Sequence, residues 1–162
     1  MPPIFVGGMG STPQVLAANG EVPVADPQKT VFTDDEVASQ VINIVQEAKQ
    51  YVVLITPYLE LWGHAQTALE LAVKRGVKST VIIRKEDWKP KTMDNISWLQ
   101  ANGIQVFAAE WLHAKVYLNE HAVFVSSMNL TEVSTRNSLV LGLAIREREA
   151  DKRVRDYVKN TV

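Results

Sequence analysis

The sequence predicts an α/β fold in which a mixed, mostly parallel β-sheet is flanked by helices on both faces. Two runs rich in β-branched residues, 51–56 and 79–84, are typical of strands that are buried on both sides of a sheet. Helical patterns stand before and between them, as in parallel strands joined by crossover helices. Two later apolar runs, 112–118 and 122–125, are separated by only three residues, which indicates a hairpin and hence an antiparallel part of the sheet.

The first half of the chain alternates helices with strands. Thr33 stands three residues before Glu36, which is the spacing of a helix capping box, and the apolar residues that follow lie on one helical face. Gly76 follows a cationic last turn, which is typical of a helix end. The further elements expected in this half are helices at about 33–49, 65–75 and 93–99 and a short strand at 104–108.

The second half adds antiparallel strands and one more helix. A polar stretch, 126–138, follows the hairpin, and residues 139–145 then have the composition of a buried strand. The charged segment 146–159 is expected to form a helix that lies on the surface. We find no internal repeat, so the pattern indicates one domain.

The domain is predicted to cover residues 32–162 and to follow an extended arm at 1–31. Five of the seven prolines and four of the eight glycines lie in the first 27 residues, where no periodic apolar pattern lasts long enough to indicate an element. The arm is either a solvated terminus or a segment that packs on its own domain or on a partner, because several of its residues are apolar.

The composition narrows the classes of function. The chain has 162 residues, a formal net charge of −1 and no cysteine, and its pI is near 6.3. Disulfides, thiolate catalysis and cysteine-based zinc sites are therefore excluded, and any polyanion must be bound locally rather than by an overall basic field. No secretory signal or apolar run of roughly 18 residues is present, so we expect a cytoplasmic protein that has no membrane partner.

One cluster of residues indicates anion chemistry. His113 and Lys115 alternate along the first hairpin strand, so an imidazole and an ammonium are expected to lie side by side on one face. Ser127 and Asn129 follow the second strand, where a turn can bring a hydroxyl and an amide to the same face. Lysine, asparagine and serine suit phosphate oxygens, which leaves the histidine as the group that reacts.

These residues resemble the phospholipase D superfamily, whose HxK(x)4D motif and following GSxN turn match His113, Lys115, Ser127 and Asn129, with Glu120 at the acidic position. The likeness covers roughly residues 34–160 and implies a phospholipase D-like fold. The chain departs from the motif in two further ways. Ser126 replaces the usual glycine, and the spacer is one residue shorter.

The resemblance also points to a missing group. The family has a carboxylate after the SxN turn that orients the catalytic histidine, whereas Leu139 or Val140 occupies the matching position here. Without that carboxylate a histidine loses control of its tautomer, which lowers the reaction rate. Glu132 and Glu120 are the alternative carboxylates that the sequence offers.

The resemblance implies a metal-independent phosphodiesterase that needs no cofactor and works as a homodimer across the active site. His113 of one copy would attack phosphorus to form a phosphohistidine, while the second copy's histidine protonates the leaving oxygen. A chain with a single motif supplies half of such a site. Compact members of this kind resemble nucleases, so nucleic acid, DNA or RNA, is the expected partner.

A polar segment beyond the second buried strand is expected to extend the site, because open α/β sheets bind ligands at the carboxyl ends of strands. The residues predicted to contact substrate are Tyr58, Arg84, Lys85, Trp88 and Lys89. Charged loops of this kind are also common without any function. The other histidines, His64 and His121, are expected in loops, and the other tryptophans, Trp62, Trp98 and Trp111, in the core or an interface.

Three functions remain open at this level. The first is a nuclease that cleaves nucleic-acid phosphodiesters. The second is a hydrolase or transferase of phospholipids or other small phosphodiesters. The third is a phosphate-binding or assembly module whose catalysis is impaired, and the missing carboxylate supports this last possibility.

Overall fold

The computed structural model describes residues 28–136 and 138–161. In chain order its elements are β1 (Val31–Thr33), α1 (Asp35–Glu47), β2 (Tyr51–Thr56), β3 (Leu59–Glu60), α2 (Gly63–Lys74), β4 (Lys78–Arg84), α3 (Pro90–Ala101), β5 (Gln105–Ala109), β6 (Val116–Asn119), β7 (Val123–Ser126), β8 (Leu130–Thr131), α4 (Glu132–Arg136), β9 (Leu141–Ile145) and α5 (Arg148–Thr161). Among the described residues, no helix has the length and apolar character that crossing a membrane requires.

A central sheet of seven strands organises the domain, in the order β1-β9-β7-β6-β2-β4-β5, and β3 pairs with β8 separately. Strands β2, β4 and β5 are parallel neighbours. The pairings β2–β6, β6–β7, β7–β9 and β9–β1 are antiparallel. The predicted mixed α/β class is confirmed. Within the seven-stranded sheet, parallel pairing is confined to β2, β4 and β5, and the separate pair of β3 and β8 is also parallel.

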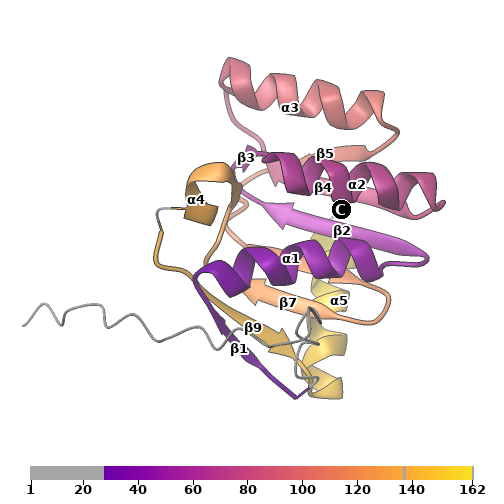
Figure 1. Cartoon of the computed structure of the whole chain (residues 1–162), viewed down its shortest axis with the longest axis vertical. Helices are drawn as coiled ribbons and strands as arrows, with labels where there is room; N and C mark the ends of the chain where they lie inside the picture. Colours follow the sequence, from indigo (N-terminus) through magenta and orange to yellow (C-terminus); the bar gives the residue numbers. More distant parts are fainter. Residues whose placement is uncertain (1–27, 137, 162) are drawn as a thin grey trace, which may run out of the picture.

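Helices cover both faces of the sheet, as predicted (Figure 1). Helices α1 and α2 pack on one face over a cluster that contains Leu54 and Tyr117. The C-terminal helix α5 packs on the other face, where Val158 contacts a second cluster that contains Ile55 and Val116. Adjacent residues of one strand thus enter different clusters, because side chains alternate between the two faces of a sheet.

Local signals in the sequence account for several element ends. The carboxylate of Glu36 accepts a hydrogen bond from the Thr33 N–H at 3.1 Å, which is one half of the predicted capping box. Gly76 and Gly103 follow α2 and α3 with φ angles of +84° and +77°. Both glycines therefore supply the left-handed conformation that commonly ends a helix.

Other features differ from the expectation. The first hairpin strand begins at Val116, so residues 112–115 form an irregular segment before it, and the predicted polar stretch contains β8 and α4. Residues 1–27 of the predicted arm lie outside the described residues. Val31, assigned to the arm, pairs with Leu143 in the sheet, so the folded part starts a few residues earlier than predicted.

One edge of the sheet gathers the ends of strands that are far apart in the chain. Strands β2 and β4 end there because they are parallel, and β6 begins there because it is antiparallel to β2. Strand β7 ends at the same edge because it is antiparallel to β6. In Figure 1 this is the edge beside α4, toward which the arrowheads of β2 and β7 point.

Candidate active site

Arg84, the last residue of β4, connects three segments of the chain through three hydrogen bonds. Its Nε donates to the Leu112 carbonyl at 2.8 Å, and its Nη1 donates to the Tyr58 hydroxyl at 3.1 Å. Its Nη2 lies 3.1 Å from Nδ1 of His113. The predicted contacts Tyr58 and Arg84 are thus brought to the predicted reactive histidine, although the segments are far apart in sequence.

The contact with Arg84 fixes the hydrogen-bonding role of the His113 ring. A guanidinium has only N–H donors, so Nδ1 of His113 must act as the acceptor. In the neutral ring the proton then lies on Nε2. This arrangement presents an N–H at Nε2, which can donate a hydrogen bond to a phosphate oxygen.

Lys115 lies close to the same two residues. Its ammonium donates to the main-chain carbonyl of His113 at 3.0 Å. Partial burial lowers the pKa of Lys115 below its ordinary value, and the positive charge of Arg84 lowers it further. Two neighbouring cations repel each other, so an anion bound between them would stabilise this arrangement.

The turn after β7 is held against the end of β2 by hydrogen bonds. The Leu130 N–H donates to Oγ1 of Thr56 at 3.0 Å, and the buried Tyr117 hydroxyl donates to the Met128 carbonyl at 2.6 Å. The hydroxyl of Ser127 accepts a hydrogen bond from the Leu141 N–H at 3.0 Å. Ser127 thus anchors the start of β9, and its predicted contact with phosphate stays a prediction.

Asn129 lies in this turn and is partly buried. Its Oδ1 is buried and, within the part of the chain that the structure describes, is the buried side-chain oxygen or nitrogen without a hydrogen-bond partner. A buried polar atom without a partner costs about 1–3 kcal/mol. No donor of the described fold satisfies this acceptor, and the predicted contact of Asn129 with phosphate stays a prediction.

A match to a family profile shows which protein family the chain belongs to. The profile described as "Cardiolipin synthase, PLD-like domain" matches residues 41–162, which is most of the chain. The chain belongs to this family. No curated protein sequence matched the chain.

Solved structures agree with the PLD-like fold. Nuc, a phospholipase D family member from Salmonella typhimurium, is 18% identical with a TM-score of 0.70, covering 82% of this chain and 93% of Nuc. NucT from Helicobacter pylori is 14% identical with a TM-score of 0.71 and the same coverage. TrmBL2, an archaeal chromatin protein, is 14% identical with a TM-score of 0.54, covering 84% of this chain and 55% of TrmBL2. At these identities the similarity establishes the fold alone.

Glu120 does not belong to the site of this PLD-like domain, contrary to the prediction. It follows β6 at the opposite end from His113, and its carboxylate accepts hydrogen bonds from the N–H groups of Lys49 at 2.6 Å and Tyr51 at 3.3 Å. Burial alone would raise the pKa of Glu120, but the backbone N–H donors outweigh it and lower the pKa to about 2. The residue fastens β6 to the start of β2.

The missing carboxylate is not replaced at the matching position. Leu139 is 86% exposed and Val140 is buried in the core. Glu132, an alternative carboxylate in the sequence, forms an ion pair with Arg136 at 3.1 Å. Arg84 therefore occupies the position beside Nδ1 of His113 that the resemblance assigns to a carboxylate.

The predicted substrate contacts after β4 separate into different roles. The Trp88 indole is partly buried against the core and donates to the Arg84 carbonyl at 2.9 Å, so it supports Arg84, and its contact with substrate stays a prediction. Lys85 forms an exposed ion pair with Glu110 at 3.0 Å. Lys89 is exposed just before α3, and its contact with substrate stays a prediction.

Trp111 was assigned to the core or an interface from its residue type, but in the structure it is 92% exposed. Trp62 and Trp98 are packed against the core, as expected. The exposure of Trp111 depends on the turn between β5 and β6, where its φ is +59°. In the sequence, only the closeness of Trp111 to the histidine motif could have indicated that this tryptophan lies beside the site.

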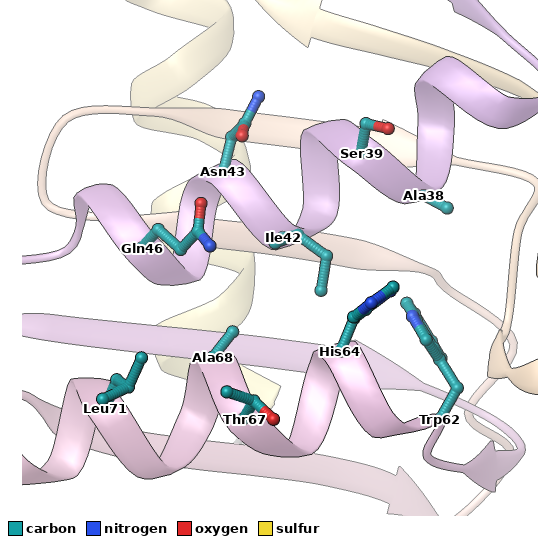
Figure 2. A pocket seen from close by; sticks show the side chains of 10 residues that line it. All are labelled: Ala38, Ser39, Ile42, Asn43, Gln46, Trp62, His64, Thr67, Ala68 and Leu71. Carbon is teal, nitrogen blue, oxygen red and sulfur yellow. The ribbon is translucent and has the colours of Figure 1, made fainter. Parts of the chain in front are cut away.

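A second pocket lies between α1 and α2 and is separate from the histidine site. Figure 2 shows His64 and Trp62 next to each other on the α2 side and Ile42 reaching toward them from α1. His64 is the second residue of α2 rather than a loop residue, which corrects the expectation. None of the residues that hold His113 lines this pocket.

Proposed function

We propose that this chain is a metal-independent phosphodiesterase that cleaves nucleic acid and works as a homodimer. The observation that carries the proposal is the grouping of His113, Lys115 and Arg84 at one edge of the sheet. Two cations and an imidazole fit a phosphate diester, which offers acceptor oxygens and a single negative charge. The amide of Asn129 would add a further donor through its Nδ2.

The first chemical step requires Arg84 to move. A phosphate is a better acceptor for a guanidinium than an imidazole nitrogen, because the hydrogen bonds are charge-assisted and bidentate. When Arg84 turns to the phosphate, Nδ1 of His113 becomes free to carry the ring proton, and Nε2 gains the lone pair that a nucleophile needs.

The reaction then proceeds in two displacements. Nε2 of His113 attacks phosphorus, the bond from phosphorus to the leaving oxygen breaks, and that oxygen takes a proton from the second copy's His113. Water attacks the phosphohistidine, its proton passes to the second copy's histidine, and the phosphorus–nitrogen bond breaks. The second copy's His113 acts as the acid in its imidazolium form, with a proton on each ring nitrogen, so it becomes a neutral imidazole when it protonates the leaving oxygen and can then take the proton of water.

An exposed apolar face supports the homodimer. Leu141 and Leu143 alternate on one face of β9, and Val31 lies opposite Leu143 on β1. All three side chains are about half-exposed. This face adjoins Ser127 through the hydrogen bond to Leu141, so a second copy that covers it would lie next to the half-site. Exposed apolar patches of this kind mark protein interfaces.

The test is to trap the covalent intermediate. The protein is incubated in EDTA with an oligonucleotide that carries a labelled internal phosphate, and the mixture is denatured rapidly and analysed by mass spectrometry. We expect an oligonucleotide fragment joined to His113 through the labelled phosphate, because the attack releases only one of the two strands of a diester, and no such adduct on the His113→Ala variant. Cleavage that needs a metal and persists in His113→Ala would contradict the proposal, and turnover of phospholipid vesicles in its place would contradict the choice of nucleic acid.

A second candidate is a protein that binds nucleic acid without cleaving it. It is favoured by the Arg84 contact with Nδ1 and by the absence of a carboxylate at Leu139, and the structurally similar chromatin protein TrmBL2 binds DNA. Leu139→Glu separates the candidates. A binder that has lost its carboxylate should gain cleavage from this change, whereas the equivalent change at Leu71, an exposed leucine on α2, should have no effect.

A further inference from the structure

Trp111 is held outward at a fixed place beside the site. Its φ of +59° is a left-handed conformation that costs a non-glycine residue about 1 kcal/mol or more. The turn is fastened on both sides, because the Ala109 carbonyl accepts from the Lys85 N–H at 3.0 Å and the Leu112 carbonyl accepts from Nε of Arg84 at 2.8 Å. The fold therefore maintains an exposed indole whose burial would gain free energy.

A cleft connects this indole with the histidine site. The residues that line it are Arg84, Lys85, Glu86, Asp87, Glu110 and Trp111. Arg84 belongs to both the cleft and the site, since its Nη2 contacts His113. Trp111 and His113 are two residues apart, so their Cα atoms are at most about 7 Å apart. A group next to a phosphate at His113 would thus reach the indole.

We propose that Trp111 is the stacking platform for a nucleobase that neighbours the phosphate at His113, and that the substrate is therefore single-stranded nucleic acid. This inference rests on the proposed function and narrows it. A free base offers a planar face to the indole, whereas the faces of bases in a duplex are covered by their neighbours. A duplex would have to unstack before it could bind.

The charges around the cleft support the same placement. Glu86 and Asp87 repel phosphates, whereas Glu110 is compensated by its ion pair with Lys85, so the backbone would stay over Arg84 and Lys115 while the base enters the cleft. The carboxylates also provide acceptors for the amino groups that nucleobases carry. Glu86 and Asp87 would thus keep the backbone out of the cleft that receives the base.

The experiment measures binding in the His113→Ala background, so that cleavage does not interfere. Fluorescence anisotropy gives the Kd for a single-stranded oligonucleotide, for an abasic strand of the same length and for a duplex. We expect Trp111→Ala to weaken binding of the single strand roughly tenfold and to leave the abasic strand unchanged. Trp111→Phe should keep most of the affinity, and Tyr157→Ala, which removes an exposed aromatic residue of α5, should change nothing.

Several outcomes would contradict the proposal that Trp111 is a stacking platform. One is unchanged affinity of Trp111→Ala for the single strand, and another is an equal loss on the abasic strand. A shift of oligomeric state in ultracentrifugation without a loss of affinity would assign Trp111 to an interface between copies. If Trp111→Ala weakens binding of the single strand as expected but the wild-type chain never cleaves, the stacking role of Trp111 is supported and the proposed phosphodiesterase activity is wrong. If no strand binds at all, both proposals fail.

Discussion

Two asparagines at opposite edges of the sheet differ in how far the fold satisfies the same side chain. Asn119, the last residue of β6, is fully buried; its Oδ1 accepts from the N–H groups of His121 and Ala122, both at 2.8 Å, and its Nδ2 donates to the Ile44 carbonyl at 2.8 Å. Asn129, beyond β7, has a buried Oδ1 with no partner among the described residues. The fold satisfies the first side chain and leaves an acceptor of the second unsatisfied.

The contrast extends to the residues around each asparagine. Beside Asn119, Arg155 donates to the Asn119 carbonyl at 2.7 Å and to the Tyr51 hydroxyl at 2.9 Å, and Glu120 binds backbone N–H groups. At the opposite edge, Lys115 and Arg84 lie close together, and neither forms an ion pair with a carboxylate among the described residues. The proposed function assigns these two neighbouring cations to the binding of phosphate.

The largest expected effect is on the rate of cleavage, when His113 is replaced. His113→Ala should lower the rate of oligonucleotide cleavage roughly a thousandfold or more, because it removes both nucleophile and acid. The melting temperature should change little, since the side chain is exposed. Cleavage assays and thermal melts on the same preparation check both parts, and cleavage at the wild-type rate would remove His113 from the chemistry.

The next effect concerns the apolar face beside the site. Leu141→Glu should dissociate the homodimer and reduce cleavage about a hundredfold at low protein concentration, because a half-site lacks the second histidine and a charge in a buried interface is costly. Sedimentation velocity and activity are measured across protein concentrations. Leu71→Glu is the control, since Leu71 is similarly exposed on α2. A dimer that survives Leu141→Glu would place the interface elsewhere.

The two asparagines can be tested against each other. Asn119→Ala should reduce the free energy of unfolding by about 3 kcal/mol, because it leaves several buried groups without partners. Asn129→Ala should leave stability unchanged or slightly raised and weaken oligonucleotide binding about tenfold. Urea denaturation and anisotropy measure the two quantities. Equal losses of stability in both variants would show that Asn129 is also a structural residue.

The smallest expected effect is on the pH dependence of stability, at the edge of the sheet that contains Asn119 and Glu120. Because the pKa of Glu120 in the folded protein is lowered to about 2, its contribution to stability is present above the ordinary pKa of about 4.3 and is lost as the pH falls from there toward 2. Glu120→Gln should therefore lower the free energy of unfolding, measured by urea denaturation near neutral pH, by about 1–2 kcal/mol. Its stability should also fall less steeply than that of the wild type as the pH is lowered from about 4.3 toward 2. Identical pH profiles would contradict the assignment.

The regular elements were largely predictable because local patterns carry them. Strand β2 has the predicted bounds, Tyr51–Thr56, and the ends of α2 and α3 follow from Gly76 and Gly103. The sequence also indicated that His113 and Lys115 lie close together, and the structure brings both to Arg84, while their roles in a phosphate site stay a prediction. Arg84 was expected near the substrate, but its contact with Nδ1 of His113 was not foreseen.

The sequence by itself determined the main helices and strands and the mixed sheet, and it drew attention to His113 and Lys115, because periodicity and residue type act over short stretches of chain. Only the tertiary structure decided that Glu120 fastens the far edge, that Trp88 supports Arg84 while Trp111 is exposed, and that a guanidinium rather than a carboxylate lies beside His113. These outcomes depend on which strand ends meet at one edge, and that depends on packing between segments far apart in the chain.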